Sequence, residues 1–377
     1  MSLIVVGCGA SPTPPPSPPQ VLELEASLLV TASGEPISDR ELAEEGVAAL
    51  GARDFGRCRE RLELLLEHFE SSPYSYPSRY NLGLCQEEQG AHLEAAASFA
   101  LYVKEARERR EQREQLDGRL RLGVNLLKGE RPQPARQIFD QLLTREFTLG
   151  ADRAECHLRR AQAQRALREV ERAQSDLDSA LQNAQRAGGD AAQLRALVTE
   201  IHFERGELFR EIAEQIELRL PLAAMKRAFN DKTRFFRKSM RSYLSAVQQQ
   251  ERYWSPAAGN RLGSLYETFY HQVTSAEHPP EFNELQRRLY FFKIKTRLAP
   301  MLQEALTLYE RTLSLGARLG SAGEWIEATE AGADRLRVLV LQLQRELDEE
   351  RRALGDDAPE EQPEGAAAEE TERVGGS

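Results

Sequence analysis

The sequence has few histidines and no common catalytic motif. Its six histidines form no HExxH motif and no histidine–carboxylate cluster at metal-ligand spacing. His271 and His278 lie seven residues apart, but Pro279-Pro280 places the second in a loop. GxSxG, P-loop and GxGxxG motifs are also missing. We therefore predict no catalytic residue, metal, cofactor or small-molecule substrate. A glycan-processing enzyme would need a carboxylate pair in a cleft, whereas solvated helix faces account for the acids here.

Long apolar runs are absent too, and aromatic residues make up only 7% of the chain. No run approaches the ~18 apolar residues of a membrane-spanning helix, so we expect none. Charged residues reach 29% and the mean hydropathy is −0.55. Helix formers dominate and alternating apolar positions are rare, which predicts an all-α fold. So polar a composition fits a thin, exposed solenoid better than a thick globule.

The net charge of −10 comes mostly from one end of the chain. Residues 355–377 hold eight acids and one arginine, a net −7 (1 − 8), which leaves −3 (−10 + 7) for the rest. We predict an acidic disordered tail there and no nucleic-acid partner.

A Leu-Gly pattern repeats along the chain. Gly83 is followed by Ala95 and Phe99, with Gly90 between them as a turn. These residues are separated by 12 and then 4 positions, and the same two intervals occur in four sets of three residues along the chain. The sets are Gly46/Cys58/Leu62, Gly83/Ala95/Phe99, Gly123/Ala135/Phe139 and Ala161/Ala173/Leu177. Each set predicts two antiparallel helices, in which we expect the small residue of the second helix to face the glycine of the first.

The anchors of these sets are 37, 40 and 38 residues apart. These intervals and residue classes resemble the tetratricopeptide repeat (TPR), whose period is about 34 residues. The resemblance covers roughly residues 38–187 and implies a right-handed α-solenoid of TPR-like hairpins, about six in all. A generic helical bundle is the alternative.

Four segments are predicted. They are a lipoprotein signal remnant with a Pro-rich tether (1–37), four repeats (38–189), a module of longer helices (190–354) and the acidic tail (355–377). Ser38 should cap the first helix, after a weakly ordered lead-in over 21–37. In the third segment we predict helices over 194–220, from Trp254, over 287–320 and from Trp325 to near Leu354.

The first residues resemble the end of a bacterial lipoprotein signal. Val5-Val6-Gly7-Cys8 fits the lipobox, and lipidation of Cys8 would give a stable anchor. In lipoproteins of this kind, an aspartate directly after the cysteine retains the protein in the inner membrane. Here Gly9 occupies that position, so the resemblance implies that the protein is anchored in the outer membrane and faces the periplasm. A basic n-region is missing, and an earlier start than Met1 would supply it. A disordered N-terminus on a cytoplasmic protein is the alternative.

Besides Cys8 the chain has three cysteines, Cys58, Cys85 and Cys156. A disulfide between any two of them would leave the third unpaired. Cys58 and Cys85 fall on helices that should pack together, so a disulfide between them is an alternative. We expect buried thiols.

Two surfaces are candidates for binding. In TPR-like repeats the first helix of each hairpin lines the groove, and the equivalent positions here are Tyr80, Leu84, Leu120, Val124, Leu158 and Gln162. They lack the Lys/Asn carboxylate clamp of some relatives, so we predict a groove for apolar protein segments. A basic, aromatic stretch from Met225 to Arg241, which includes Lys232, is the second candidate, with Lys226, Arg227, Arg234, Arg237 and Lys238 as its patch. The alternative there is that the aromatic rings are buried and the bases pair with acids.

A second resemblance covers about residues 235–340. Tyr243, Trp254, Gly263, Tyr309 and Trp325 occur in the order seen in the terminal module of repeat proteins from myxobacterial envelopes, some linked to gliding motility. It implies an outer-membrane lipoprotein scaffold that binds other proteins of an envelope complex of the motility or secretion type. A cytoplasmic TPR regulatory adaptor is the alternative.

Overall fold

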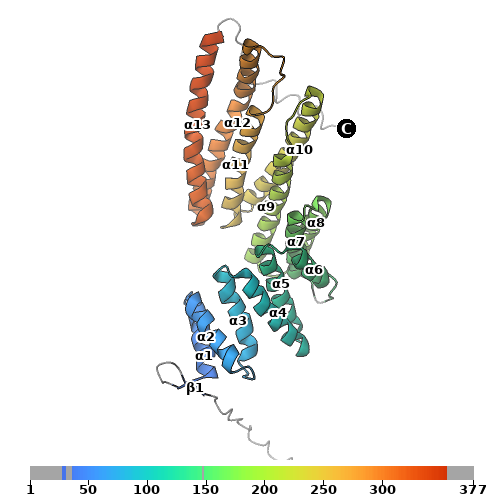
Figure 1. The fold of residues 1–377 in the computed structure, drawn as a ribbon, viewed down its shortest axis with the longest axis vertical. Coiled ribbons are helices and arrows are strands. Elements are labelled where there is room, and N and C mark those ends of the chain that lie inside the picture. Colours follow the sequence, from blue (N-terminus) through green and yellow to red (C-terminus); the bar gives the residue numbers. More distant parts are fainter. Residues whose placement is uncertain (1–27, 31–35, 147, 355–377) are drawn as a thin grey trace, which may run out of the picture. The chain divides into compact units, whose positions relative to one another are not determined.

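The computed structural model describes residues 28–30, 36–146 and 148–354 (Figure 1). Their fold is all-α apart from one short ribbon, as composition predicts. The chain divides into two compact units, one ending at Glu108 and one beginning at Arg109. The four-segment division predicted from the sequence remains a prediction, and Cys8 and the acidic tail lie outside the described residues.

Unit 1 contains two helical hairpins behind a short β-ribbon. Its elements are β1 (Leu28–Val30), β2 (Pro36–Ser38), α1 (Asp39–Gly51), α2 (Phe55–His68), α3 (Ser75–Glu88) and α4 (His92–Glu108). Each helix packs on the next, and the first helices α1 and α3 also touch. Ser38 caps α1 in a capping box with Glu41, as predicted.

The β-ribbon corrects the expected lead-in. Strands β1 and β2 pair antiparallel, with Leu29 opposite Ile37. The side chain of Ile37 is buried in a cluster with Leu42 and Leu65. This apolar contact places β2 against the first hairpin.

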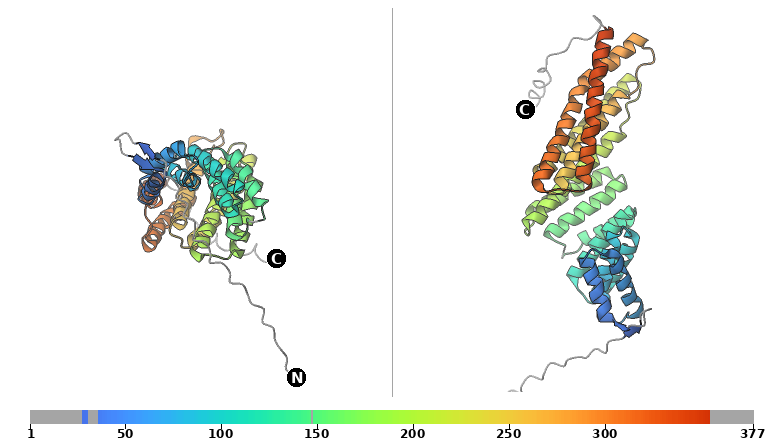
Figure 2. Two further views of the ribbon diagram at one scale, coloured as in Figure 1. Left: turned by 90° about the horizontal axis from the view of Figure 1, so that it is seen from below. Right: turned by 90° about the vertical axis from the view of Figure 1, so that its left-hand side faces the viewer.

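Unit 2 continues the hairpins with longer helices. Its elements are α5 (Gln112–Lys128), α6 (Pro132–Leu143), α7 (Gly150–Ala166), α8 (Val170–Arg186), α9 (Ala191–Gln215), α10 (Leu222–Gln248), α11 (Trp254–Thr274), α12 (Glu284–Leu319) and α13 (Glu324–Leu354). Successive helices pack together, and each first helix also touches the next along the row α5, α7, α9, α11, α13. Such nearest-neighbour packing defines an α-solenoid. Figure 2 shows α12 and α13, orange and red, side by side.

The turn inside each of the first four hairpins has one geometry. A residue with positive φ ends the first helix, seven positions after each repeat anchor: Arg53 (61°), Gly90 (76°), Glu130 (59°) and Arg168 (61°). The next amide donates back over the turn, as from Arg131 to the Leu126 carbonyl oxygen at 2.8 Å. These bonds satisfy carbonyls that a helix end leaves unpaired. Only one of the four turns uses glycine, so three carry a left-handed side-chain residue.

Aromatic or leucine side chains cover the repeat glycines, which corrects the expected pairing. A Cβ on Gly83 would lie 2.8 Å from the Phe99 ring, and one on Gly123 would lie 2.5 Å from the Phe139 ring. Ala95, expected to face Gly83, is buried one turn earlier on α4. The flat ring fills the space that the missing side chain leaves and lets the helices approach closely.

Helix α9 ends five residues earlier than predicted, because a buried lysine closes it. Lys232 of α10 is 1% exposed. It donates to the carbonyl oxygens of Ala213 at 2.6 Å and Ile216 at 3.0 Å. A cation at a helix C-terminus satisfies free carbonyls and the helix dipole.

One tyrosine joins the last three helices. Tyr309 of α12 is 1% exposed. It covers Gly263 of α11, and a Cβ on Gly332 of α13 would lie 2.8 Å from it. Both glycines are therefore places where a neighbouring helix presses against the same ring.

Candidate partner-binding groove

The facing sides of α7 and α9 carry a buried network of charges. Arg159 of α7 holds Glu200 of α9 through two nitrogens, one of them at 3.1 Å. Gln162 donates to Glu204 at 3.0 Å, and Arg165 approaches Glu204 at 3.2 Å. Both acids are 7% exposed. Removing one partner of such a pair would leave a buried charge uncompensated, so each pair favours the observed packing of α7 against α9 over one that separates the two charges.

The network continues toward α10 and α11 through Glu207. This acid accepts from the Tyr243 hydroxyl at 2.5 Å and pairs with Arg210 at 2.8 Å and Arg261 at 3.1 Å. Burial acts to raise the pKa of Glu207, but the hydrogen bonds from Arg210 and Tyr243 and the charges of Arg210 and Arg261 together outweigh it, and the pKa is lowered. Burial raises the pKa of Glu204, because its arginine partner only partly opposes the loss of solvation.

A sequence signal for this network exists in the spacing of acids on α9. Positions 200, 204, 207 and 211 follow the 4-3-4 spacing of one helix face. The prediction of solvated acids is therefore wrong for this face of α9, which packs against α7.

A cavity of about 470 Å³ opens between the first helices α5, α7 and α9. Its charged lining consists of Arg113, Arg159, Asp152, Glu155, Asp190 and Glu200, a net charge of −2 (2 − 4). Both arginines of the lining are already paired with acids of the same lining. Arg113 pairs with Asp152 at 2.7 Å, and Arg159 pairs with Glu200. The excess acid makes this cavity suited to a polar, basic segment rather than to an apolar one.

The apolar groove positions are mostly packed inside hairpins. Tyr80 contacts the rings of Phe99 and Tyr102 at 5.4 and 5.0 Å between centroids. Leu120 is 8% exposed, and Val124 packs against the same cluster. Leu84 is half-buried and Leu158 fully buried, whereas Gln162 lies in the charge network. Their role in binding stays a prediction.

The basic stretch of α10 divides by environment. Lys226, Arg227 and Arg237 are exposed. Arg234 pairs with Asp231 at 3.1 Å. Lys238 lies over the Phe209 and Phe235 rings, at 4.9 and 5.5 Å from their centroids. The patch is therefore smaller than the run of bases in the sequence, and Lys232 is a structural cap.

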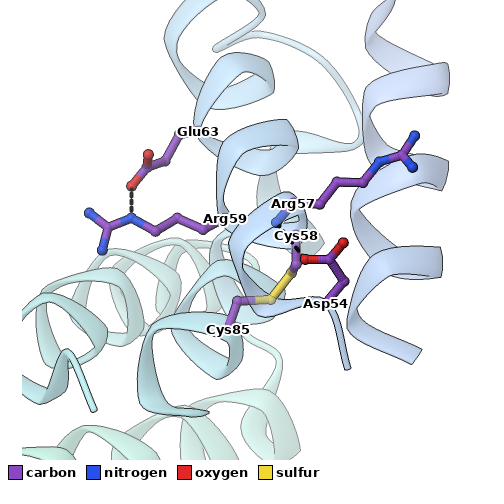
Figure 3. Close-up of a disulfide and its surroundings, with 6 residues drawn as sticks. All are labelled: Asp54, Arg57, Cys58, Arg59, Glu63 and Cys85. Atoms are coloured by element: carbon purple, nitrogen blue, oxygen red, sulfur yellow. Dashed lines mark hydrogen bonds and ion pairs between the residues drawn. A yellow bond between two sulfur atoms is a disulfide. The ribbon is translucent and has the colours of Figure 1, made fainter. Parts of the chain in front are cut away.

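A disulfide joins Cys58 of α2 to Cys85 of α3, so the expectation of buried thiols is wrong for this pair. Their Cα atoms lie 6.3 Å apart (Figure 3). Asp54 accepts from the Arg57 amide at 3.1 Å and fixes the start of α2 beside the bond. Cys156 is a buried free thiol whose pKa burial raises to about 12.

Across the described ranges, no cluster of histidines, cysteines and acids has the arrangement of a metal site. His157 instead contacts Asp176 at 2.8 Å. Within the same ranges no helix is both long and apolar enough to cross a membrane.

The helices described above make this chain an α-solenoid of tetratricopeptide-like hairpins. Neither a family model nor a curated protein matches it. Among solved structures, it is similar to a tetratricopeptide repeat protein from Parabacteroides merdae (15% identity, 79% of this chain and 98% of that one, TM-score 0.37). It is also similar to a TPR repeats protein from Bacteroides fragilis (13%, 80% and 99%, TM-score 0.29) and to the apo form of RapI (10%, 82% and 99%, TM-score 0.46).

Proposed function

We propose that this chain is a non-enzymatic scaffold that binds other proteins through the groove of its first helices. The observation that carries the proposal is the net-acidic cavity between α5, α7 and α9. It lies on the row of first helices, where a solenoid presents one continuous surface to a partner. Its fixed charges recognise and orient a polar segment.

We further propose that the scaffold is an outer-membrane lipoprotein facing the periplasm. The lipobox-like Val5-Val6-Gly7-Cys8 supports an anchor at Cys8. The Cys58–Cys85 disulfide supports an oxidising compartment, where such bonds persist, over the cytoplasmic adaptor. The resemblance of residues 235–340 to myxobacterial envelope modules supports assistance in assembling a motility- or secretion-type complex.

Charge reversal in the groove tests the binding proposal. The double variant Glu155→Lys/Gln193→Lys changes the lining charge from −2 to +1, and both side chains are at least partly exposed. We expect crosslinked cells to yield far fewer proteins bound to this variant than to the wild type. The control Glu171→Lys reverses an exposed acid on α8, away from the cavity. Equal capture by all three proteins would overturn the groove as the binding surface.

Lipid labelling tests the anchor. Cells given labelled palmitate should label the wild-type protein and Cys156→Ala, but not Cys8→Ala, which should also leave the membrane fraction. An unlabelled wild-type protein in the soluble fraction contradicts the lipoprotein proposal.

A further inference from the structure

An apolar pocket of about 480 Å³ lies in unit 2, lined by α10, α12, the C-terminal end of α11 and the connection before α10. Four of its lining residues, Leu218, Met225, Val273 and Leu298, are buried. Leu222 and Phe229 belong to its wall and are 46% and 37% exposed. Large side chains left in water around a recess mark a binding surface more often than scattered single ones do.

The pocket has opposing helix faces with one base each. On α10, Leu222, Met225, Lys226 and Phe229 follow the spacing of a single face. On α12, Arg297 lies one position before the buried Leu298. Lys226 and Arg297 are the only charged residues of the lining, both are exposed, and neither forms an ion pair with any residue the structure describes.

Charge complementarity therefore defines the occupant. We propose that this α10–α12 pocket binds a partner-protein segment that inserts a bulky apolar side chain and places carboxylates beside Lys226 and Arg297. The inserted side chain removes apolar surface from water on both molecules. The two bases select an acidic flank and reject a basic one by like-charge repulsion.

A recess suits a side chain better than a membrane surface. An interfacial helix inserts protruding apolar residues into the bilayer, whereas here four of the apolar lining residues are buried. The proposal rests on the proposed protein-binding function, but its surface is separate from the cavity between α5, α7 and α9.

A random 12-residue peptide library displayed on phage and selected on the full chain provides the probe. We expect the recovered peptides to share an apolar residue flanked by Asp or Glu. A synthetic peptide of the most frequent sequence should bind at least about tenfold more tightly than its Lys-substituted counterpart in fluorescence anisotropy.

Matched variants localise the binding. Lys226→Glu/Arg297→Glu should weaken binding of the synthetic peptide about tenfold or more. By contrast, Arg241→Glu, at an exposed position of the same helix outside the lining, should leave binding unchanged. Circular dichroism confirms that each variant folds. Phe229→Ala should also weaken binding, which separates the apolar contribution from the charges.

Three results would overturn this pocket assignment. The first is no enrichment of acidic apolar peptides, and the second is equal affinity of the synthetic peptide for both charge variants. The third is that vesicles with one-third anionic phospholipid, and not the peptide, bind in a way that depends on the pocket residues. The groove variant Glu155→Lys/Gln193→Lys should keep the peptide. A negative result for the α10–α12 pocket therefore does not affect the test of the cavity between α5, α7 and α9. A negative result for that cavity likewise does not affect the test of the pocket.

Discussion

Reduction of the Cys58–Cys85 disulfide should loosen the first two hairpins selectively. The bond closes a loop with a sequence separation of 27 residues. In the chain-entropy model, a loop of this length contributes about 3.5 kcal/mol by restricting the unfolded chain. Reduction keeps both sulfur atoms in the core, so it isolates this contribution from the packing loss that alanine would add.

Native-state hydrogen exchange, read by mass spectrometry of peptides, measures this effect locally. Peptides of α2 and α3 should exchange up to roughly 300-fold faster in the reduced protein. Peptides of α11 and α12, in the other unit, provide the control and should not change. The double variant Cys58→Ala/Cys85→Ala should behave like the reduced protein or worse.

Alkylation of the denatured chain checks the premise. Without reductant, a maleimide should label Cys156 but neither Cys58 nor Cys85, and reductant should expose both. The reasoning fails if both are labelled without reductant, or if exchange in α2 and α3 changes no more than in the control peptides.

Three further predictions concern the turns, the helix contacts and one histidine. Gly123→Ala should cost about 1–3 kcal/mol in denaturant unfolding because its Cβ meets a ring at 2.5 Å, while Gly188→Ala, with open space around it, should stay within about 0.5 kcal/mol. Glu130→Gly should stabilise the fold by about 1 kcal/mol, because glycine adopts the positive φ of this turn without the steric cost of a side chain. Gly90→Ala should destabilise the fold by a similar amount for the same reason, and thermal melts measure both effects. Burial lowers the pKa of His202 from 6.5 to about 4, so its neutral form favours folding above pH 6.5 and this stability is lost toward pH 4. His202→Gln should flatten that part of the stability–pH curve, and an unchanged slope would show that the histidine does not contribute.

The sequence predicted the repeats because their determinants are local. Gly83 and Phe99 belong to one hairpin, and the same interval recurs at Gly123 and Phe139. Ser38 marks a helix start through its capping box, and Pro256 lies in the first turn of the helix that begins at Trp254. Both signals depend on a few neighbouring residues.

What the sequence did not predict depends on contacts between distant residues. Lys232 looks like one base in a run, and only the arrival of the α9 C-terminus makes it a cap. The acids at 200 and 204 look solvated until α7 packs against them. Cys58 and Cys85 lie on adjacent hairpins, and whether their sulfur atoms meet depends on the exact helix rotation.

The contact of Tyr309 with glycines on two helices has an evolutionary consequence. Because one ring fills both gaps, an added methyl group at 263 or 332 would force the tyrosine ring to shift. Related chains should therefore change these three positions together, with a smaller residue at 309 accompanying alanine on either side. The fourth repeat already shows such an exchange within this chain: Ala161 stands at a glycine position and Leu177 at the aromatic one, and both lie in one buried cluster.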